Sequence, residues 1–230
     1  MTKRCGCMMI VKMLMLGALG TNCYVVWCEE TKEAIVVDPA FSTENEGKRT
    51  VLHLVEANSL DVKYIVNTHG HADHTSGNGL VKKITGAPIV IHELDAPLLG
   101  KSGEGWAHMF GIKLVSPPAD KTVREGEAIR FGKQLLRVIH TPGHTEGSIS
   151  LVGNDCVFVG DTLFQGSIGR TDFPGGSYKQ IIQSIKQKLL ILPDYFKIYT
   201  GHGPTTTIGT ERKTNPFILA PEQYAPDDEE

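Results

Sequence analysis

The sequence has little excess charge of either sign, few aromatic residues and no long apolar run. Lysine and arginine number 23 and aspartate and glutamate 26, which gives a formal net charge of −3 and a pI of about 6.3. A basic surface that would attract nucleic acid is therefore not expected. No apolar stretch approaches the roughly 20 residues needed to cross a bilayer, so we expect no membrane-spanning segment.

Cysteine is also scarce, and its spacing does not suggest a disulfide framework. The scattered cysteines are Cys5, Cys7, Cys23, Cys28 and Cys156. Their odd number and spacing favour a reduced, cytoplasmic compartment. The first twenty residues resemble a secretory signal, with Lys3 and Arg4 before an apolar stretch. Because Lys12 interrupts that stretch and no convincing cleavage site follows, we predict a first β-strand there instead.

Apolar residues make up 40% and charged residues 21% of the 230 residues, which is enough apolar surface for a core. Short apolar runs alternate with amphipathic stretches, a pattern typical of an α/β protein. The predicted strands lie at about 8–16, 22–28, 34–37, 64–66, 89–91, 128–131, 134–140, 148–152, 156–159 and 197–200. Helices are predicted at about 46–58, at 76–84 and after an N-cap at Ser177. We interpret 92–127 as a surface excursion, 1–220 as a single domain and 221–230 as an acidic, disordered tail.

One short segment concentrates side chains that bind metals. Thr68-His69-Gly70-His71-Ala72-Asp73-His74 places three histidines and a carboxylate within six residues, just after an apolar strand. Imidazole nitrogen and carboxylate oxygen bind Zn²⁺ and other first-row metals. In an extended segment His69 and His71 point to the same side and can hold one ion. Asp73 and His74, where the chain turns, can face a second ion nearby.

Three more polar residues each follow an apolar strand. His144 lies in a Thr-Pro-Gly-His-Thr segment, Asp161 follows Gly160, and His202 lies between two glycines. Ligands gather at the carboxyl ends of strands in α/β folds. Each residue taken singly is more often structural than catalytic, but together with the first motif they favour a metal site.

The ordered set H-x-H-x-D-H, then His in T-P-G-H-T, Asp in G-D and His in G-H resembles the signature of the metallo-β-lactamase superfamily. The resemblance spans Leu16 to about Phe217 and implies a four-layer αββα sandwich with the site at one edge between two sheets. It also implies two divalent metal ions, Zn above all, with Fe or Mn as alternatives. The implied ligands are His69, His71 and His144 for one ion, Asp73, His74 and His202 for the other, and Asp161 as the bridge. Asp38 is implied to orient a ligand histidine.

The segment from Gly166 to Gly176, which contains Gly-Arg-Thr-Asp-Phe, resembles the glyoxalase II-like branch of hydroxyacylglutathione hydrolases and their short single-domain relatives. The resemblance implies hydrolysis of a small acyl thioester by a hydroxide that bridges the ions. Asp161 and Asp73 are the implied catalytic residues, Asp161 by holding both ions and Asp73 by assisting proton transfer. Arg170 is expected to bind a substrate carboxylate or, alternatively, to form a structural salt bridge with Asp172.

The chain departs from the long glyoxalase II enzymes in two ways that bear on glutathione recognition. Thirteen residues follow Phe217, fewer than the C-terminal helical segment that helps those enzymes bind glutathione. No tyrosine follows His202, and Arg170 stands where those enzymes carry a lysine. We therefore expect weak recognition of the glutathione part.

Several alternatives remain open. Persulfide dioxygenases share the Gly-Arg-Thr-Asp-Phe segment, so a mononuclear iron site built from His69, His144 and Asp161 is the first alternative. A flavodiiron reductase is less favoured because His71 stands where those domains usually carry glutamate, and a nuclease is disfavoured by the acidic balance. A non-catalytic metal-binding module is disfavoured by the complete ligand set. The predicted partner is a small-molecule thioester, with no nucleic acid and no membrane, and no oligomeric state is indicated.

Overall fold

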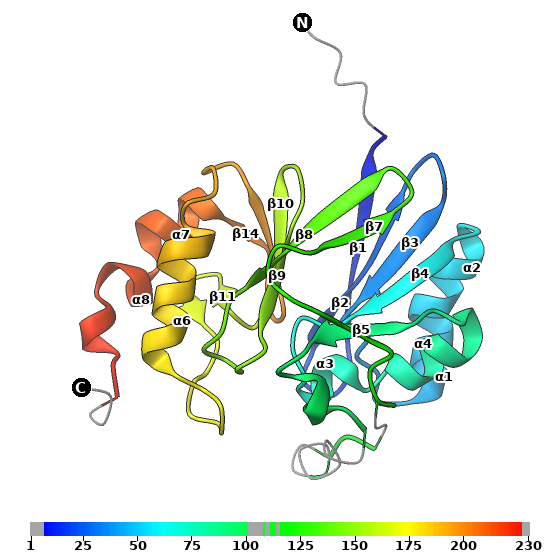
Figure 1. Cartoon of the computed structure of the whole chain (residues 1–230), viewed down its shortest axis with the longest axis horizontal. Coiled ribbons are helices and arrows are strands. Elements are labelled where there is room, and N and C mark those ends of the chain that lie inside the picture. Colours follow the sequence, from blue (N-terminus) through cyan, green and yellow to red (C-terminus); the bar gives the residue numbers. More distant parts are fainter. Residues whose placement is uncertain (1–6, 101–107, 109–110, 114–115, 227–230) are drawn as a thin grey trace, which may run out of the picture.

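Two six-stranded sheets pack face to face, and helices cover their outer faces (Figure 1). The structure is a computed structural model that describes residues 7–100, 108, 111–113 and 116–226. The strand orders are β1-β2-β3-β4-β5-β6 in the first sheet and β14-β13-β10-β9-β8-β7 in the second. The α/β class and the four-layer αββα sandwich that the resemblance implied are confirmed.

The strands of the two sheets are between two and eight residues long. Those of the first sheet are β1 (Met9–Leu16), β2 (Thr21–Cys28), β3 (Glu33–Val37), β4 (Asp61–Val66), β5 (Ile89–His92) and β6 (Lys121–Val123). Those of the second sheet are β7 (Ala128–Phe131), β8 (Gln134–His140), β9 (Ile149–Val152), β10 (Cys156–Gly160), β13 (Lys197–Thr200) and β14 (Thr206–Thr207). A separate hairpin consists of β11 (Leu163–Phe164) and β12 (Ser167–Ile168).

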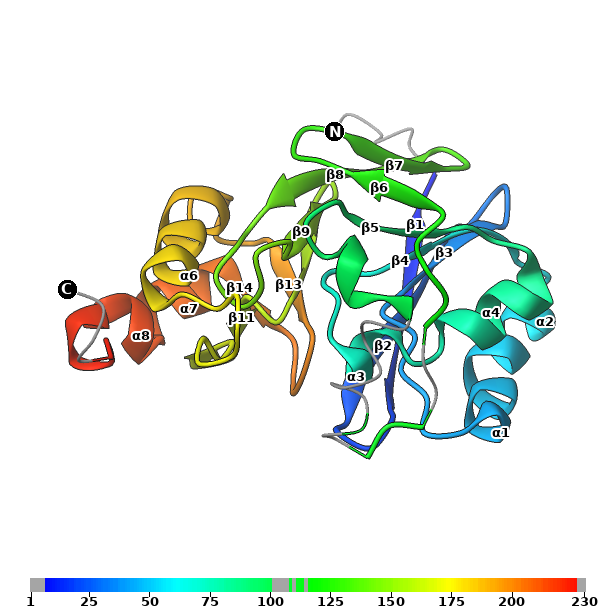
Figure 2. The ribbon, with the colours of Figure 1, turned by 60° about the horizontal axis from the view of Figure 1, so that its bottom comes forward.

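The helices are short and fall into two groups, one on each outer face (Figure 2). Beside the first sheet lie α1 (Glu44–Gly47), continued through a π-helical stretch (Lys48–Leu52) into α2 (His53–Ala57), with α3 (Ala72–Thr75), α4 (Asn78–Thr85) and a 3-10 turn (Ala96–Leu98). Beside the second lie α6 (Tyr178–Ser184) with its π-helical continuation (Ile185–Leu189), α7 (Ile208–Thr214), α8 (Pro216–Leu219) and a 3-10 turn (Pro221–Gln223). None of the helices in the described part of the chain is both long enough and apolar enough to cross a bilayer.

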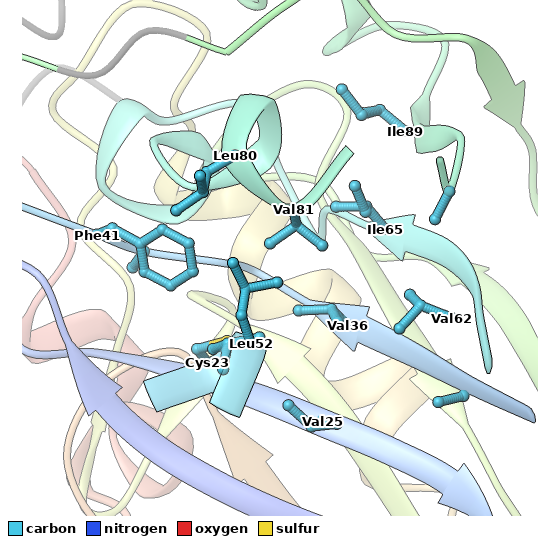
Figure 3. Packing of buried hydrophobic residues seen from close by; sticks show 14 of the residues in the cluster. Cys23, Val25, Val36, Phe41, Leu52, Val62, Ile65, Leu80, Val81 and Ile89 are labelled. Carbon is cyan, nitrogen blue, oxygen red and sulfur yellow. The ribbon is translucent and has the colours of Figure 1, made fainter. Parts of the chain in front are cut away.

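Alternation along the strands divides the core into three apolar layers. In β2, Val25 packs with the helix residues Leu52 and Val81, whereas Tyr24 and Val26 pack between the sheets. Figure 3 shows Leu52 and Val81 lying close together beside Val36, with Val25 on the neighbouring strand. β10 alternates in the same way between the sheet–sheet core and the core beneath α6. A strand buried on both faces reads as a continuous apolar run, which is why the central strands are recognisable in the sequence.

Most predicted elements are present, but β6 within the excursion over 92–127, the β11–β12 hairpin, β14 and the helices α7 and α8 were not predicted. The hydroxyl of Ser177 caps α6 by accepting a 3.3 Å hydrogen bond from the amide of Gln180, as predicted. The excursion is not purely a surface feature, because β6 extends the first sheet and Asp95 is only 1% exposed. Within it, residues 101–107, 109–110 and 114–115 lie outside the described residues, as do residues 227–230 of the predicted tail. Residues 221–223 form the last 3-10 turn.

Candidate metal site

The predicted ligands lie at the carboxyl ends of strands that share one edge of the sandwich. β3 and β4 run parallel in the first sheet, and Asp38 and the His69 segment follow them. In the second sheet β10 runs parallel to β13 and antiparallel to β9, and β9 runs antiparallel to β8. The carboxyl ends of β8, β10 and β13 therefore meet at one edge, which brings together His144, Asp161 and His202 from distant parts of the chain.

All seven predicted ligand residues converge there in overlapping groups. Within each group, one ligand atom per residue lies within 4.8 Å of those of the others. The groups are His69, His71 and His144; His69, His74 and Asp161; and Asp73, His74 and His202. The first and third groups match the two predicted half-sites, and the second joins them through Asp161. The arrangement fits a dinuclear site.

A chain of hydrogen bonds fixes which nitrogen of His69 faces the centre. The Thr68 hydroxyl donates to Oδ2 of Asp38 at 2.6 Å, so its oxygen accepts from Nδ1 of His69 at 3.2 Å. Protonation at Nδ1 leaves the lone pair of His69 on Nε2, which is the metal-binding atom in this orientation. The amide of Thr68 also donates to Oδ1 of Asp38 at 2.8 Å, which holds the strand end in place.

His74 and His144 are oriented by acceptors in the same way. Nδ1 of His74 lies 3.1 Å from Oδ2 of Asp38, and Nδ1 of His144 lies 2.8 Å from the carbonyl oxygen of Arg170. Each partner accepts a hydrogen bond from Nδ1–H, so in the neutral form of both rings Nε2 carries the lone pair toward the centre. Three of the five histidines are thus held in the tautomer that binds a cation.

Two observations test whether the residues fit bound metal. Nε2 of His69 and Oδ1 of Asp161 are buried without a hydrogen-bond partner, as expected for atoms whose partner is a cation. Facing nitrogens lie 2.9 Å apart in His71 and His144 and 3.2 Å apart in His74 and His202. Tetrahedral Zn²⁺ with Zn–N bonds of about 2.0–2.1 Å sets such atoms about 3.3 Å apart. The donor set and its spacing fit two divalent cations.

Glycine at position 201 is required by the close approach of the candidate bridge. A Cβ atom there would lie 1.9 Å from Oδ1 of Asp161 and 2.9 Å from Cε1 of His74. Any larger residue would displace one of these two groups. The glycine before His202 is therefore part of the site and does more than mark a turn.

Burial and the charges of neighbouring side chains shift the pKa values of the cluster, and for some residues the two effects oppose each other. Burial, with the neighbouring histidines, holds the pKa of His69 well below its usual range and lowers that of His71 to about 3. Burial disfavours charge on His74 too, but the carboxylates of Asp161 and Asp73 outweigh it and raise the pKa of His74. Burial would raise the pKa of Asp73 and of Asp161, but His74 and His202 lower both. Both carboxylates are therefore anionic at neutral pH, ready to bind cations.

Asp95 ties together two loops that carry predicted ligands. Its Oδ2 accepts hydrogen bonds from the amide of Gly70 at 2.8 Å and from the hydroxyl of Thr145 at 2.7 Å, and its Oδ1 accepts one from the amide of Gly147 at 2.7 Å. Gly70 lies between His69 and His71, while Thr145 follows His144. Burial raises the pKa of Asp95 despite these three donors. One buried carboxylate thus holds the His71 and His144 loops at a fixed separation.

The start of β2 holds the third loop. The side-chain amide of Asn22 donates to the carbonyl oxygens of Thr200 at 3.0 Å and Gly203 at 2.8 Å, on either side of His202. The Thr21 hydroxyl donates to Oδ2 of Asp73 at 3.1 Å. A strand of the first sheet therefore positions two ligands of one half-site, Asp73 and His202.

A cavity of about 370 Å³ opens beside the cluster. Its apolar wall comprises Leu19, Phe164, Ile168 and Phe173. Arg170 also lines it and forms a bidentate pair with Asp172, at 2.7 and 2.6 Å, with its guanidinium 3.6 Å from the Phe173 ring centre. A larger cavity of about 490 Å³ lies beside Leu94 and Lys188, but no predicted ligand lines it.

Sequence reasoning missed four residues that position the ligands: Thr21, Asn22, Thr68 and Asp95. Asp95 carried a usable signal, because it follows β5 as the ligands follow their own strands. Thr68 immediately precedes the motif. Thr21 and Asn22 gave no local signal, since they act on loops that are distant in sequence.

Comparisons with known proteins agree with this geometry. A family model described as the metallo-beta-lactamase superfamily matches residues 16–202. The hydroxyacylglutathione hydrolase GloC of Haemophilus influenzae is 35% identical over 214 residues, which cover 91% of this chain and 98% of that protein.

Two solved structures are similar over nearly the whole chain. The B3 metallo-beta-lactamase BLEG-1 is 32% identical with a TM-score of 0.83, covering 92% of this chain and all of that one. TTHA1623, solved in a di-iron-bound form, is 34% identical with a TM-score of 0.79, covering 90% of this chain and all of that one. With the ligand geometry and the extent of these matches, the chain belongs to the metallo-β-lactamase superfamily.

Proposed function

We propose that this protein is a metal-dependent hydrolase that cleaves small acyl thioesters of the hydroxyacylglutathione type. The observation that carries the proposal is the complete pair of half-sites joined by Asp161. The similarity to GloC over most of both chains supports the thioester class. The di-iron form of TTHA1623 supports a dinuclear site and keeps iron, beside zinc and manganese, among the metals to be tested.

His69, His71 and His144 would hold one ion, Asp73, His74 and His202 the other, and Asp161 both. Two bound divalent cations would lower the pKa of a water ligand to near 7 and stabilise negative charge on the substrate carbonyl oxygen. A thiolate leaves readily, so the site needs no strong general acid. Asp73, anionic and held by Thr21, lines the cavity, where it can accept a proton within its ligand role.

The cavity wall suits a small acyl group better than a large charged one. Phe164, Ile168 and Phe173 provide an apolar surface that excludes water beside the reacting carbonyl. Arg170 has its charge partly matched by Asp172, so its attraction for a substrate carboxylate is weakened. This pairing supports weak recognition of the glutathione part, as the sequence also suggested.

Steady-state kinetics with thioesters that share a lactoyl group but differ in thiol would test the proposal. We expect zinc-loaded protein to hydrolyse both the glutathione thioester and a truncated N-acetylcysteamine thioester, with similar KM values and a rate that rises around pH 7. A strong preference for glutathione would contradict weak recognition but leave the hydrolase intact.

Two further measurements address other activities of the same site. A β-lactam is included as a substrate because BLEG-1 is described as a metallo-beta-lactamase. Oxygen uptake with glutathione persulfide is measured on iron-loaded protein. Persulfide-dependent oxygen uptake without thioester hydrolysis in any metal form would overturn the hydrolase in favour of the mononuclear iron alternative.

A further inference from the structure

Two cysteines lie in contact at the start of β1, outside the metal site. Sγ of Cys7 is 2.8 Å from Sγ of Cys28, closer than the roughly 3.5–4.0 Å usual for non-bonded heavy atoms. Cys28 is fully buried at the end of β2, whereas Cys7 is partly exposed. Neither has a part in the proposed hydrolysis.

Backbone pairing holds the two sulfur atoms together. In the antiparallel register of β1 and β2, Met9 is opposite Cys28, and the amide of Glu29 donates to the carbonyl oxygen of Met8 at 3.0 Å. On the other side, the side-chain amide of Gln134 donates to the carbonyl oxygen of Cys7 at 2.7 Å. The contact is therefore a consequence of strand register as well as of side-chain rotamers.

The surroundings make the two thiols chemically unequal. Burial alone would raise the pKa of Cys28, but hydrogen bonds from Cys7, from Thr31 and from the amide of Lys133 lower it to about 6. The pKa of Cys7 is raised by desolvation and by sharing its proton with Cys28. By contrast, burial raises the pKa of Cys156 to about 12 and also raises that of Cys23. Cys28 is the thiolate among the described cysteines, and thiolates are the reactive species.

We propose that Cys7 and Cys28 are a thiol–disulfide exchange site, which a low-molecular-weight disulfide oxidises to an internal Cys7–Cys28 disulfide. The proton of Cys7 passes to the adjacent Cys28 thiolate, so the exposed Cys7 sulfur attacks the small disulfide, forms a mixed disulfide and displaces one thiolate, which takes up that proton. The Cys28 sulfur then attacks that of Cys7 and displaces the second thiolate. The two protein thiols lose two protons and two electrons, and the small disulfide gains them as two thiols.

The new bond would fasten the edge of the first sheet. β1 is an edge strand whose strand partner is β2, and the bond would close the chain from residue 7 to residue 28. Such a loop reduces the freedom of the unfolded chain, so the oxidised protein melts about 5–10 °C higher. Catalysis is unaffected, because Cys28 lies seven residues along β2 from Thr21, or roughly 23 Å.

The experiment exposes full-length, metal-loaded protein to oxidised glutathione, traps free thiols with N-ethylmaleimide in acid, and maps the linked peptides. Cleavage after Tyr24 and Trp27 separates Cys23 from Cys28. The variants are Cys7→Ser, Cys28→Ala and the matched control Cys5→Ser, which removes the neighbouring thiol. In wild type and in Cys5→Ser we expect the protein mass to fall by two hydrogen atoms, a Cys7–Cys28 link to form and Tm to rise. Dithiothreitol should reverse all three changes.

Cys7→Ser should form no internal link and show no rise in Tm, with the hydrolysis rate unchanged. Because Cys7 is partly exposed, this variant keeps the test valid even where Cys28→Ala fails to fold. Accumulation of a stable glutathione adduct on Cys7, or a link that maps to Cys5 or Cys23, would overturn the proposal. So would an internal link that leaves Tm unchanged.

Discussion

Oδ2 of Asp38 lies 3.1 Å from Nδ1 of His74, and both side chains are almost wholly buried. Asp38 adopts a φ of 49°, in the left-handed region that residues other than glycine rarely occupy. Such a conformation costs about 1–3 kcal/mol and persists where the surroundings enforce it. Here three donors, from Thr68 and His74, hold the carboxylate.

Replacing Asp38 by Asn should weaken metal binding while leaving the fold intact. The asparagine side chain keeps one acceptor oxygen but carries no charge. Its NH2 group would face one of the groups that now donate a hydrogen bond to Asp38. We expect metal affinity to fall by about 10–100-fold, measured by competition with a chromophoric chelator. Asp61→Asn, at an exposed position, is the control and should bind as wild type. Equal affinities in the two variants would show that Asp38 does not orient the ligands.

Replacing Asp161 by Asn should abolish the dinuclear site. Asp161 supplies oxygens 3.3 Å from His74, 3.5 Å from His202 and 3.7 Å from His144, so it reaches both half-sites. We expect wild type to bind two metal ions per chain, the variant to lose at least one, and hydrolysis to fall by several orders of magnitude. Elemental analysis after dialysis measures the number of metal ions per chain. Asp155→Asn, at an exposed position, is the control variant. A fully loaded variant with wild-type turnover would refute the dinuclear mechanism.

Replacing Asp95 by Ala should loosen the loops of His71 and His144. Three buried donors, on Gly70, Thr145 and Gly147, would lose their acceptor, and unfolding free energy should fall by roughly 2–5 kcal/mol. Metal affinity should fall as well, because Asp95 positions the loops that carry His71 and His144. A residue that only stabilises the fold would leave metal affinity unchanged. The control is Asp120→Ala, which also removes an acceptor from a backbone amide but lies away from the ligands. Destabilisation with unchanged metal affinity would assign Asp95 a purely structural role.

The sequence was sufficient to predict the central strands and to identify the residues that the structure brings together at one edge. The apolar runs of β3, β4 and β10 are continuous because both faces are buried, and each is followed by a polar residue of the site. The convergence of these residues depends on strand direction, which the resemblance supplied and the apolar runs alone did not.

What could not be predicted depends on contacts between distant segments. Asn22 holds the His202 loop across 178 to 181 residues, and no local pattern reveals such a partner. Edge strand β6 is only three residues long and partly exposed, so it lacks the apolar run that marked the central strands. The role of Arg170 was left open between a substrate contact and a salt bridge. The structure shows the pair with Asp172 and also places Arg170 in the lining of the cavity.

Replacing Arg170 by Ala should distinguish these two roles. The pair with Asp172 is exposed, so its loss should change stability little. If Arg170 attracts an anionic substrate, KM for lactoylglutathione should rise roughly two- to tenfold, while KM for the neutral N-acetylcysteamine thioester should not change. Asp172→Asn should have the opposite effect on lactoylglutathione, since it releases the guanidinium. An unchanged KM with a lowered Tm would support the structural salt bridge.

Metal-free protein should be most stable near pH 6.5. His69 and His71 have lowered pKa values, so below their usual value of 6.5 the unfolded chain binds more protons, and stability falls as pH decreases. The slope is about 1.4 kcal/mol per pH unit for each proton. His74 has a raised pKa, so its contribution is present below 6.5 and is lost as pH rises through the raised value. Urea unfolding from pH 5 to pH 8 after chelation measures this, with the exposed His53→Asn as control. A flat profile would show that the buried histidines titrate as in the unfolded chain.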